Sequence, residues 1–211
     1  MAAILSAVTL LLALSAAGAH ATHVGDFITG LNCGGESVTL SDGRAYMTDA
    51  DSFIGTPDQT YINPNGVFSN NPLTSVSVAE LPLYNSHRVV KSRFDIAITV
   101  GVDQNAVTAA QMIVRLHFAE IFEPAQQVNS RVFDVLIDGE PVLENFDIFN
   151  ASGSDPTVGV YRDVVIPTAA FFIVSFGQVR RQPILSAISV YNPVVTTTTV
   201  RNDCGVAFPQ M

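Results

Sequence analysis

Hydrophobic and polar residues alternate with a period of two along much of this chain. Apolar residues at 94, 96, 98 and 100 are separated by Arg93, Asp95, Ala97 and Thr99. The same alternation recurs from 111 to 118, where the apolar positions are Met112, Val114, Leu116 and Phe118. Successive side chains of a strand point to opposite faces, so this pattern predicts strands with one buried face. Further strands are predicted over residues 28–33, 131–137, 140–143, 160–166, 171–176 and 184–191.

Turn signals separate these segments. Asp138-Gly139 lies between two apolar runs, and Asp-Gly is a strong hairpin signal because its turn requires positive φ angles. No amphipathic helix longer than a turn or two is evident. Many short strands with Gly, Pro and Asn between them predict an all-β sandwich or barrel. Loops are expected over residues 48–71, 84–88, 122–130 and 150–158, where a rigid β-scaffold usually carries its binding residues.

The amino terminus has a different character. Residues 4–14 are almost entirely apolar, and the small residues of positions 15–21 follow. This arrangement predicts a signal peptide over residues 1–21, cleaved after Ala19 or Ala21. The alternative is an uncleaved anchor, although the run is shorter than the ~20 apolar residues that span a bilayer. No later run is long enough to span, and no KDEL-type signal is present, so secretion is expected and residence in the ER lumen would need a partner.

Composition narrows the possible partners. Asp and Glu number 19 against 10 Lys and Arg, which argues against nucleic acid. The two cysteines, Cys33 and Cys204, predict one disulfide in an oxidising compartment. The alternative is two unpaired thiols, with Cys33 buried as a small hydrophobe. Asn150 begins a usable N-glycosylation sequon, and residues 192–211 look like a tail whose four threonines form a glycosylated stalk or a plain linker.

Five segments resemble one known family, in its order. They are LNCGG at 31–35, YNSHR at 84–88, VRLHFAEIF at 114–122, RVFDVLIDGEPVLENFDIF at 131–149 and the closing strand at 184–190. Together they resemble malectin domains, so residues 26–191 are identified as a malectin-like carbohydrate-binding domain. The resemblance implies a single jelly-roll-like β-sandwich that binds glucose-containing oligosaccharides without catalysis. Animal malectins bind glucosylated N-glycans in the ER, and plant receptor kinases carry related domains outside the cell.

The resemblance also indicates site residues. Sugar binding uses aromatic rings that stack on the apolar face of a pyranose, together with fixed donors and acceptors for its hydroxyls. Tyr84 matches a family tyrosine, and Phe122 takes the place of another and lacks its hydroxyl. Glu123 replaces an aromatic residue, and Phe53 lies in a loop that provides a further ring. Arg181 falls near the position of a family aspartate. A hydrogen-bond donor therefore replaces the family's acceptor there.

Each of these positions also has a structural interpretation. Tyr84, Phe122 and Phe53 can be core residues, and Glu123 can be a solvated loop charge. Arg88 is expected to order the Tyr84 loop through a carboxylate.

Other function classes remain open at this point. The second hypothesis is a receptor-type or adhesin ectodomain that contacts a protein or peptide. The departures from the family's residues at Glu123 and Arg181 favour this hypothesis. A hydrolase would need two carboxylates flanking the sugar bond, and Glu120 and Asp134 are the candidates. The family gives neither a catalytic role, so no enzyme is expected. No metal or cofactor is expected either, because His117 and Glu120 lack the second histidine of a zinc motif.

Overall fold

A computed structural model describes residues 25–54, 59–62, 73–89, 94–100 and 111–193 of the 211-residue chain. The predicted signal peptide, most of the predicted tail and Cys204 lie outside these residues. Within the described part, no helix is long and apolar enough to cross a membrane.

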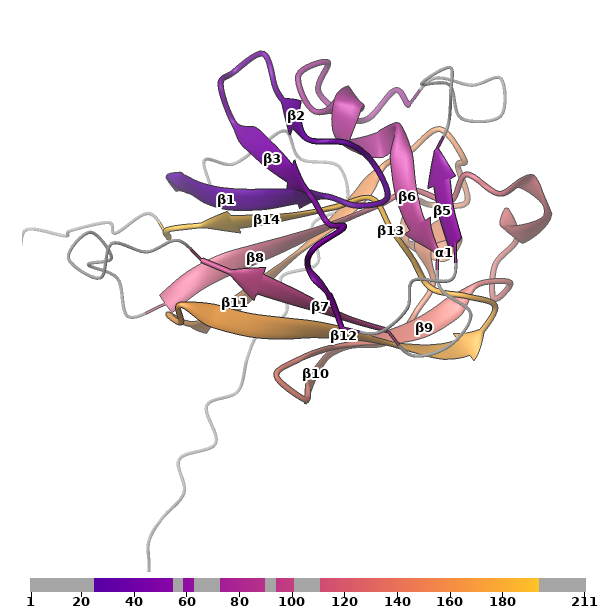
Figure 1. The fold of residues 1–211 in the computed structure, drawn as a ribbon. Coiled ribbons are helices and arrows are strands. Elements are labelled where there is room, and N and C mark those ends of the chain that lie inside the picture. Colours follow the sequence, from indigo (N-terminus) through magenta and orange to yellow (C-terminus); the bar gives the residue numbers. More distant parts are fainter. Residues whose placement is uncertain (1–24, 55–58, 63–72, 90–93, 101–110, 194–211) are drawn as a thin grey trace, which may run out of the picture.

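Six strands form the larger sheet (Figure 1). Their order is β11 (Val160–Pro167), β8 (Gln111–Phe118), β14 (Ala187–Tyr191), β1 (Phe27–Asn32), β3 (Ala45–Thr48) and β2 (Val38–Thr39). All neighbours pair antiparallel except β1 and β3, which are parallel. The sheet therefore joins the first and the last described strands at its centre.

A five-stranded sheet makes the second layer (Figure 1). Its order is β10 (Glu140–Phe146), β9 (Val132–Ile137), β12 (Phe171–Arg180), β7 (Phe94–Thr99) and β4 (Phe53–Ile54). A smaller three-stranded sheet contains β13 (Ile184–Leu185), β6 (Ser86–Val89) and β5 (Gln59–Ile62). The described residues thus form an all-β sandwich, as the alternating pattern predicts.

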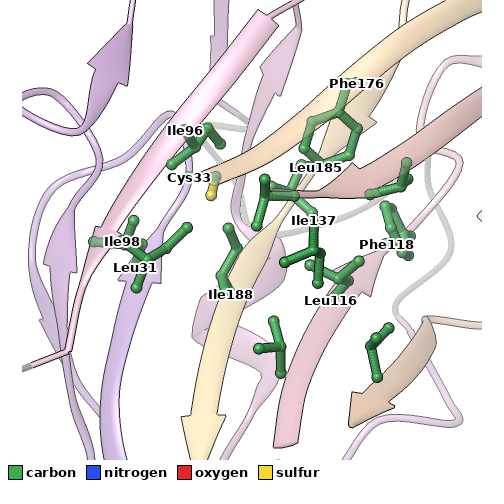
Figure 2. Close-up of a cluster of buried hydrophobic side chains, with 14 of the residues drawn as sticks. Leu31, Cys33, Ile96, Ile98, Leu116, Phe118, Ile137, Phe176, Leu185 and Ile188 are labelled. Atoms are coloured by element: carbon green, nitrogen blue, oxygen red, sulfur yellow. The ribbon is translucent and has the colours of Figure 1, made fainter. Parts of the chain in front are cut away.

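The main core draws on the inner faces of both large sheets. Figure 2 shows Leu31, Leu116, Phe118 and Ile188 from one sheet close to Ile96, Ile98, Ile137 and Phe176 from the other. These side chains are at most 4% exposed. Burial of apolar surface on this scale is the main stabilising contribution to such a fold.

The strands predicted from alternation are confirmed, and β10 and β12 extend beyond their predictions to Phe146 and Arg180. The single strand predicted over residues 184–191 is divided into β13 and β14, which belong to different sheets. The Asp138-Gly139 hairpin is also confirmed, with φ angles of 50° and 86°. Two loop predictions are wrong in part. Residues 86–88 lie in strand β6, and residues 48–71 include β4 and β5. In β6 the residues Ser86, His87 and Arg88 are all polar, so the hydrophobic alternation that marks a strand is missing. Strand β4 has only two residues, which is too few for a period of two to be visible.

Candidate functional site

Tyr84 is buried rather than presented to solvent. It ends the 3-10 helix η1 (Leu81–Tyr84), and 1% of its surface is exposed. Its hydroxyl lies 3.1 Å from Nδ1 of His117, and the two rings meet edge to face. A Cβ atom added to Gly159 would lie 3.2 Å from the Tyr84 ring and 2.5 Å from Cγ2 of Val76, so the chain packs closely here. The expectation of an exposed stacking ring is therefore corrected: a sugar would reach Tyr84 only after these neighbours moved.

The tyrosine belongs to a chain of buried polar contacts. Nε2 of His117 lies 2.8 Å from Oγ of Ser189, which lies 2.8 Å from the Tyr46 hydroxyl. Arg44 donates to the hydroxyls of Tyr46 and Tyr191 at 3.4 and 2.8 Å. Burial lowers the pKa of His117 well below its usual range, so the imidazole is neutral. A buried network whose members are paired rigidifies a fold, and this one fixes Tyr84 in place.

Arg88 has the structural role expected for it. Its guanidinium holds Asp49 through two hydrogen bonds, of 3.0 Å from Nε and 2.6 Å from Nη2. Asp49 is fully buried and also accepts the backbone N–H of Gly34 at 3.0 Å. The bidentate pair thus ties the strand that follows Tyr84 to the segment after β3 and to the end of β1.

Phe122 and Arg181 come together at the surface. The Phe122 ring is 47% exposed, and the Arg181 guanidinium carbon lies 5.8 Å from the ring centroid. Nε of Arg181 donates to Oγ of Ser130 at 3.1 Å. Glu123, next to Phe122, is exposed and begins the short 3-10 helix η2 (Glu123–Ala125). We call the surface made by Phe122, Glu123, Ser130, Arg180 and Arg181 the Phe122–Arg181 surface.

The buried ion pair between Glu120 and Arg131 supports the Phe122–Arg181 surface from the protein interior. Nε of Arg131 donates to Oε2 of Glu120 at 2.6 Å, and the two residues are 5% and 2% exposed. Oε1 of Glu120 accepts the backbone N–H of Phe122 at 3.1 Å. Arg131 also donates to the carbonyl oxygen of Gln182, the residue after Arg181. One pair of charges therefore fixes both segments that carry the Phe122–Arg181 surface.

The remaining predicted site residues are placed as follows. Phe53 pairs with Ile96 through the β4 backbone, and its side chain lies outside the described part. Cys33 is fully buried and has no disulfide partner among the described residues, and burial raises the pKa of its thiol. Cys204 lies outside the described residues, so the bridge stays a prediction. Asn150 is exposed within the short helix α1 (Ile148–Ala151), and its glycosylation stays a prediction as well.

The carboxylates considered for hydrolysis have other partners. Glu120 is paired with Arg131, and Asp134 accepts the backbone N–H of Asn145 at 2.7 Å. Both therefore serve local structure. Across the described ranges, no three His, Cys, Asp or Glu residues gather as a metal site.

Sequence reasoning missed the partners that hold these groups. Asp49 and Arg131 lie 39 and 11 residues from their partners Arg88 and Glu120. Buried charges require an opposite charge, so a charged residue within an apolar run is the signal that indicates such pairs. Arg115, which pairs with Asp163 at 2.7 Å across β8 and β11, is a further example.

Comparison with known proteins agrees with this architecture. Residues 27–196 match the family described as Malectin domain. The chain belongs to the malectin domain family. A probable receptor-like protein kinase from Arabidopsis thaliana is 33% identical over 99 residues, which cover 44% of this chain and 11% of the kinase.

Solved structures show the same fold at low sequence identity. The ANX2 ectodomain from Arabidopsis thaliana has a TM-score of 0.64 and 17% identity, covering 81% of this chain and 50% of that chain. A structure of the plant peptide RALF23 in complex with FER and LLG2 gives a TM-score of 0.62 and 15% identity, covering 81% and 49%. This malectin domain thus spans about half the length of these ectodomain chains.

Proposed function

We propose that this malectin domain is a non-catalytic recognition domain outside the cell that contacts a peptide or protein through the Phe122–Arg181 surface. The observation that carries the proposal is an exposed aromatic ring beside an arginine, held in place by the buried Glu120–Arg131 pair. Aromatic residues and arginine are the groups most enriched at the centres of protein interfaces. A preorganised surface binds more tightly because less side-chain freedom is lost on association.

Exposed apolar side chains support the same assignment. Phe122, Val128 and Val179 are each 47% exposed, and all three belong to the two segments that build this surface. A solved relative contains the peptide RALF23 with FER and LLG2, which supports a peptide or protein partner here too. Entry into the secretory pathway through the predicted signal peptide is part of the proposal.

A gluco-oligosaccharide is the second candidate ligand. The specific observation in its favour is the open Phe122 ring beside the Glu123 carboxylate, since a sugar binds through one stacking face and fixed acceptors. Against it, Tyr84 is buried and Arg181 stands where the family has an acceptor. The sugar therefore ranks below the peptide or protein.

Binding of the purified, secreted protein to two panels tests the proposal. One panel contains extracellular peptides, including RALF23, and the other contains gluco-oligosaccharides. We expect a peptide ligand, and we expect Phe122→Ala to weaken its binding at least about tenfold, as loss of a central aromatic anchor does. Phe171→Ala is the matched control, because Phe171 is 51% exposed at the opposite end of β12. Sugar binding that depends on Phe122, without any peptide ligand, would reverse the ranking.

A further inference from the structure

The described arginines fall into three groups according to their partners. Four have a carboxylate partner within 3.0 Å: Arg44, Arg88, Arg115 and Arg131. Arg162 is half-buried, with its guanidinium over the Phe146 ring. Arg180 and Arg181 are exposed, and within the described ranges no carboxylate lies at ion-pair distance from either. A chain with a formal net charge of −9 therefore presents two adjacent guanidinium groups that have no carboxylate partner in the described part of the chain.

Backbone geometry directs both of these side chains to one loop. Neighbouring residues of a regular strand point to opposite faces. Here the register of β12 against β9 shifts between Gln178 and Arg180, and Arg181 has a φ of 55°. As a result Arg180 donates to the carbonyl oxygen of Asn129 at 3.3 Å, and Arg181 donates to Oγ of Ser130 at 3.1 Å. Bulges of this kind re-aim side chains next to functional sites.

Within the described part of the chain, most of the hydrogen-bonding capacity of these two guanidinium groups remains available. A guanidinium has five N–H donors in a planar fork, and the contacts above use one donor from each. A carboxylate matches this fork and forms short, charge-assisted bonds with it. The positive φ of Arg181 adds to the case, because an L-residue in the left-handed region costs about 1–2 kcal/mol and such strain gathers at functional sites.

We propose that the Phe122–Arg181 surface recognises an acidic segment of a protein partner, with carboxylates on Arg180 and Arg181 and an apolar side chain against Phe122. This inference rests on the proposed function and names the chemistry of its ligand. Charge complementarity favours an acidic partner. The exposed aromatic ring of Phe122 favours a peptide with an apolar side chain over a fully polar polymer.

Fluorescence anisotropy with labelled peptides tests the inference. The probe alternates Glu with Phe and Gly, and a second peptide carries Gln at every Glu position. We expect the acidic peptide alone to bind the secreted protein, and its affinity to fall between about 0.05 M and about 0.5 M NaCl as the charges are screened. The double variant Arg180→Gln with Arg181→Gln is expected to bind the acidic peptide about tenfold more weakly than the wild type. Each arginine is expected to contribute about three- to fivefold to this loss.

A charge-matched variant separates a local contact from the overall field. Thr39→Glu with Thr99→Glu changes the net charge by the same two units at exposed positions on β2 and β7. We expect this control to bind within about twofold of the wild type. Equal weakening of the two double variants overturns the inference, as does equal binding of the Glu and Gln peptides.

Two further outcomes keep the inference and the proposed function apart. Peptides that bind through Phe122 irrespective of their charge would refute the acidic partner and leave the proposed function standing. An oligouronate that binds through Arg180 and Arg181, without any peptide ligand, would refute both, because the surface would then belong to a sugar.

Discussion

Replacing Arg131 by methionine tests the support of the Phe122–Arg181 surface. The change removes the 2.6 Å bond to Glu120 and the bond to the Gln182 carbonyl, and it leaves Glu120 buried without its counter-charge. Removing one partner of a buried ion pair costs about 3–5 kcal/mol of unfolding free energy. For a chain of this size, that loss corresponds to a fall of about 6–20 °C in Tm.

The assay is urea unfolding followed by far-UV circular dichroism, because the chain contains no tryptophan. A double variant, Glu120→Leu with Arg131→Met, is the control, since an apolar pair of similar volume often replaces a buried ion pair without loss. We expect the double variant to recover most of the stability but to bind its ligand less well than the wild type. The Gln182 carbonyl loses its charged partner in both variants, and the Phe122 amide loses its partner only in the double variant, where Glu120 is also replaced. A loss below about 1 kcal/mol in Arg131→Met would refute the reasoning, because a value that small is typical of exposed pairs.

Three other predictions concern Arg181, His87 and the two cysteines. Arg181→Gly is expected to raise the unfolding free energy by about 1 kcal/mol, measured in urea, because glycine adopts a φ of 55° without strain, while binding of an acidic ligand weakens. Burial lowers the pKa of His87 to about 3. Between about pH 3 and 6.5 the unfolded state therefore binds one more proton than the folded state. The unfolding free energy is expected to fall by about 1.4 kcal/mol for each pH unit as the pH drops through this window. His87→Gln should lose this component in urea titrations at several pH values, and an unchanged pH profile would contradict it. A Cys33–Cys204 bridge predicts that alkylation of the unfolded chain without reductant modifies no thiol by intact mass, whereas two alkylated cysteines would contradict the bridge.

Periodicity predicted those strands whose two faces meet different environments. In β8, Met112, Val114 and Leu116 face the main core, so apolar residues occupy every second position of the strand. Periodicity could not predict strand β6 (Ser86–Val89), because its polar residues Ser86, His87 and Arg88 are all buried. Its polar side chains are satisfied by partners distant in sequence, so burial is not visible as hydrophobicity. The sequence motifs located the segment, whereas only the contacts revealed it as a strand.

The candidate site was predictable to a similar extent. Alignment with family motifs indicated Phe122, Glu123 and Arg181, and the structure brings these three into one surface. The sequence left open whether Tyr84 is exposed or buried, because its burial depends on a contact with His117, 33 residues away in the chain. The joint orientation of Arg180 and Arg181 depends on a register shift in β12 and on the positive φ of Arg181. Neither was predictable, because positive φ angles are uncommon in residues other than glycine and an arginine in the sequence gives no indication of one.

The most direct test of the central claim compares two phenylalanines on the secreted protein. Phe122 and Phe171 are similarly exposed, at 47% and 51%, and Phe171 begins the strand whose far end carries Arg180. We expect Phe122→Ala to reduce the affinity for a peptide or protein ligand at least about tenfold, and Phe171→Ala to leave it within about twofold. Equal affinities of the two variants, or a larger loss at Phe171, would place the recognition surface elsewhere on the sandwich.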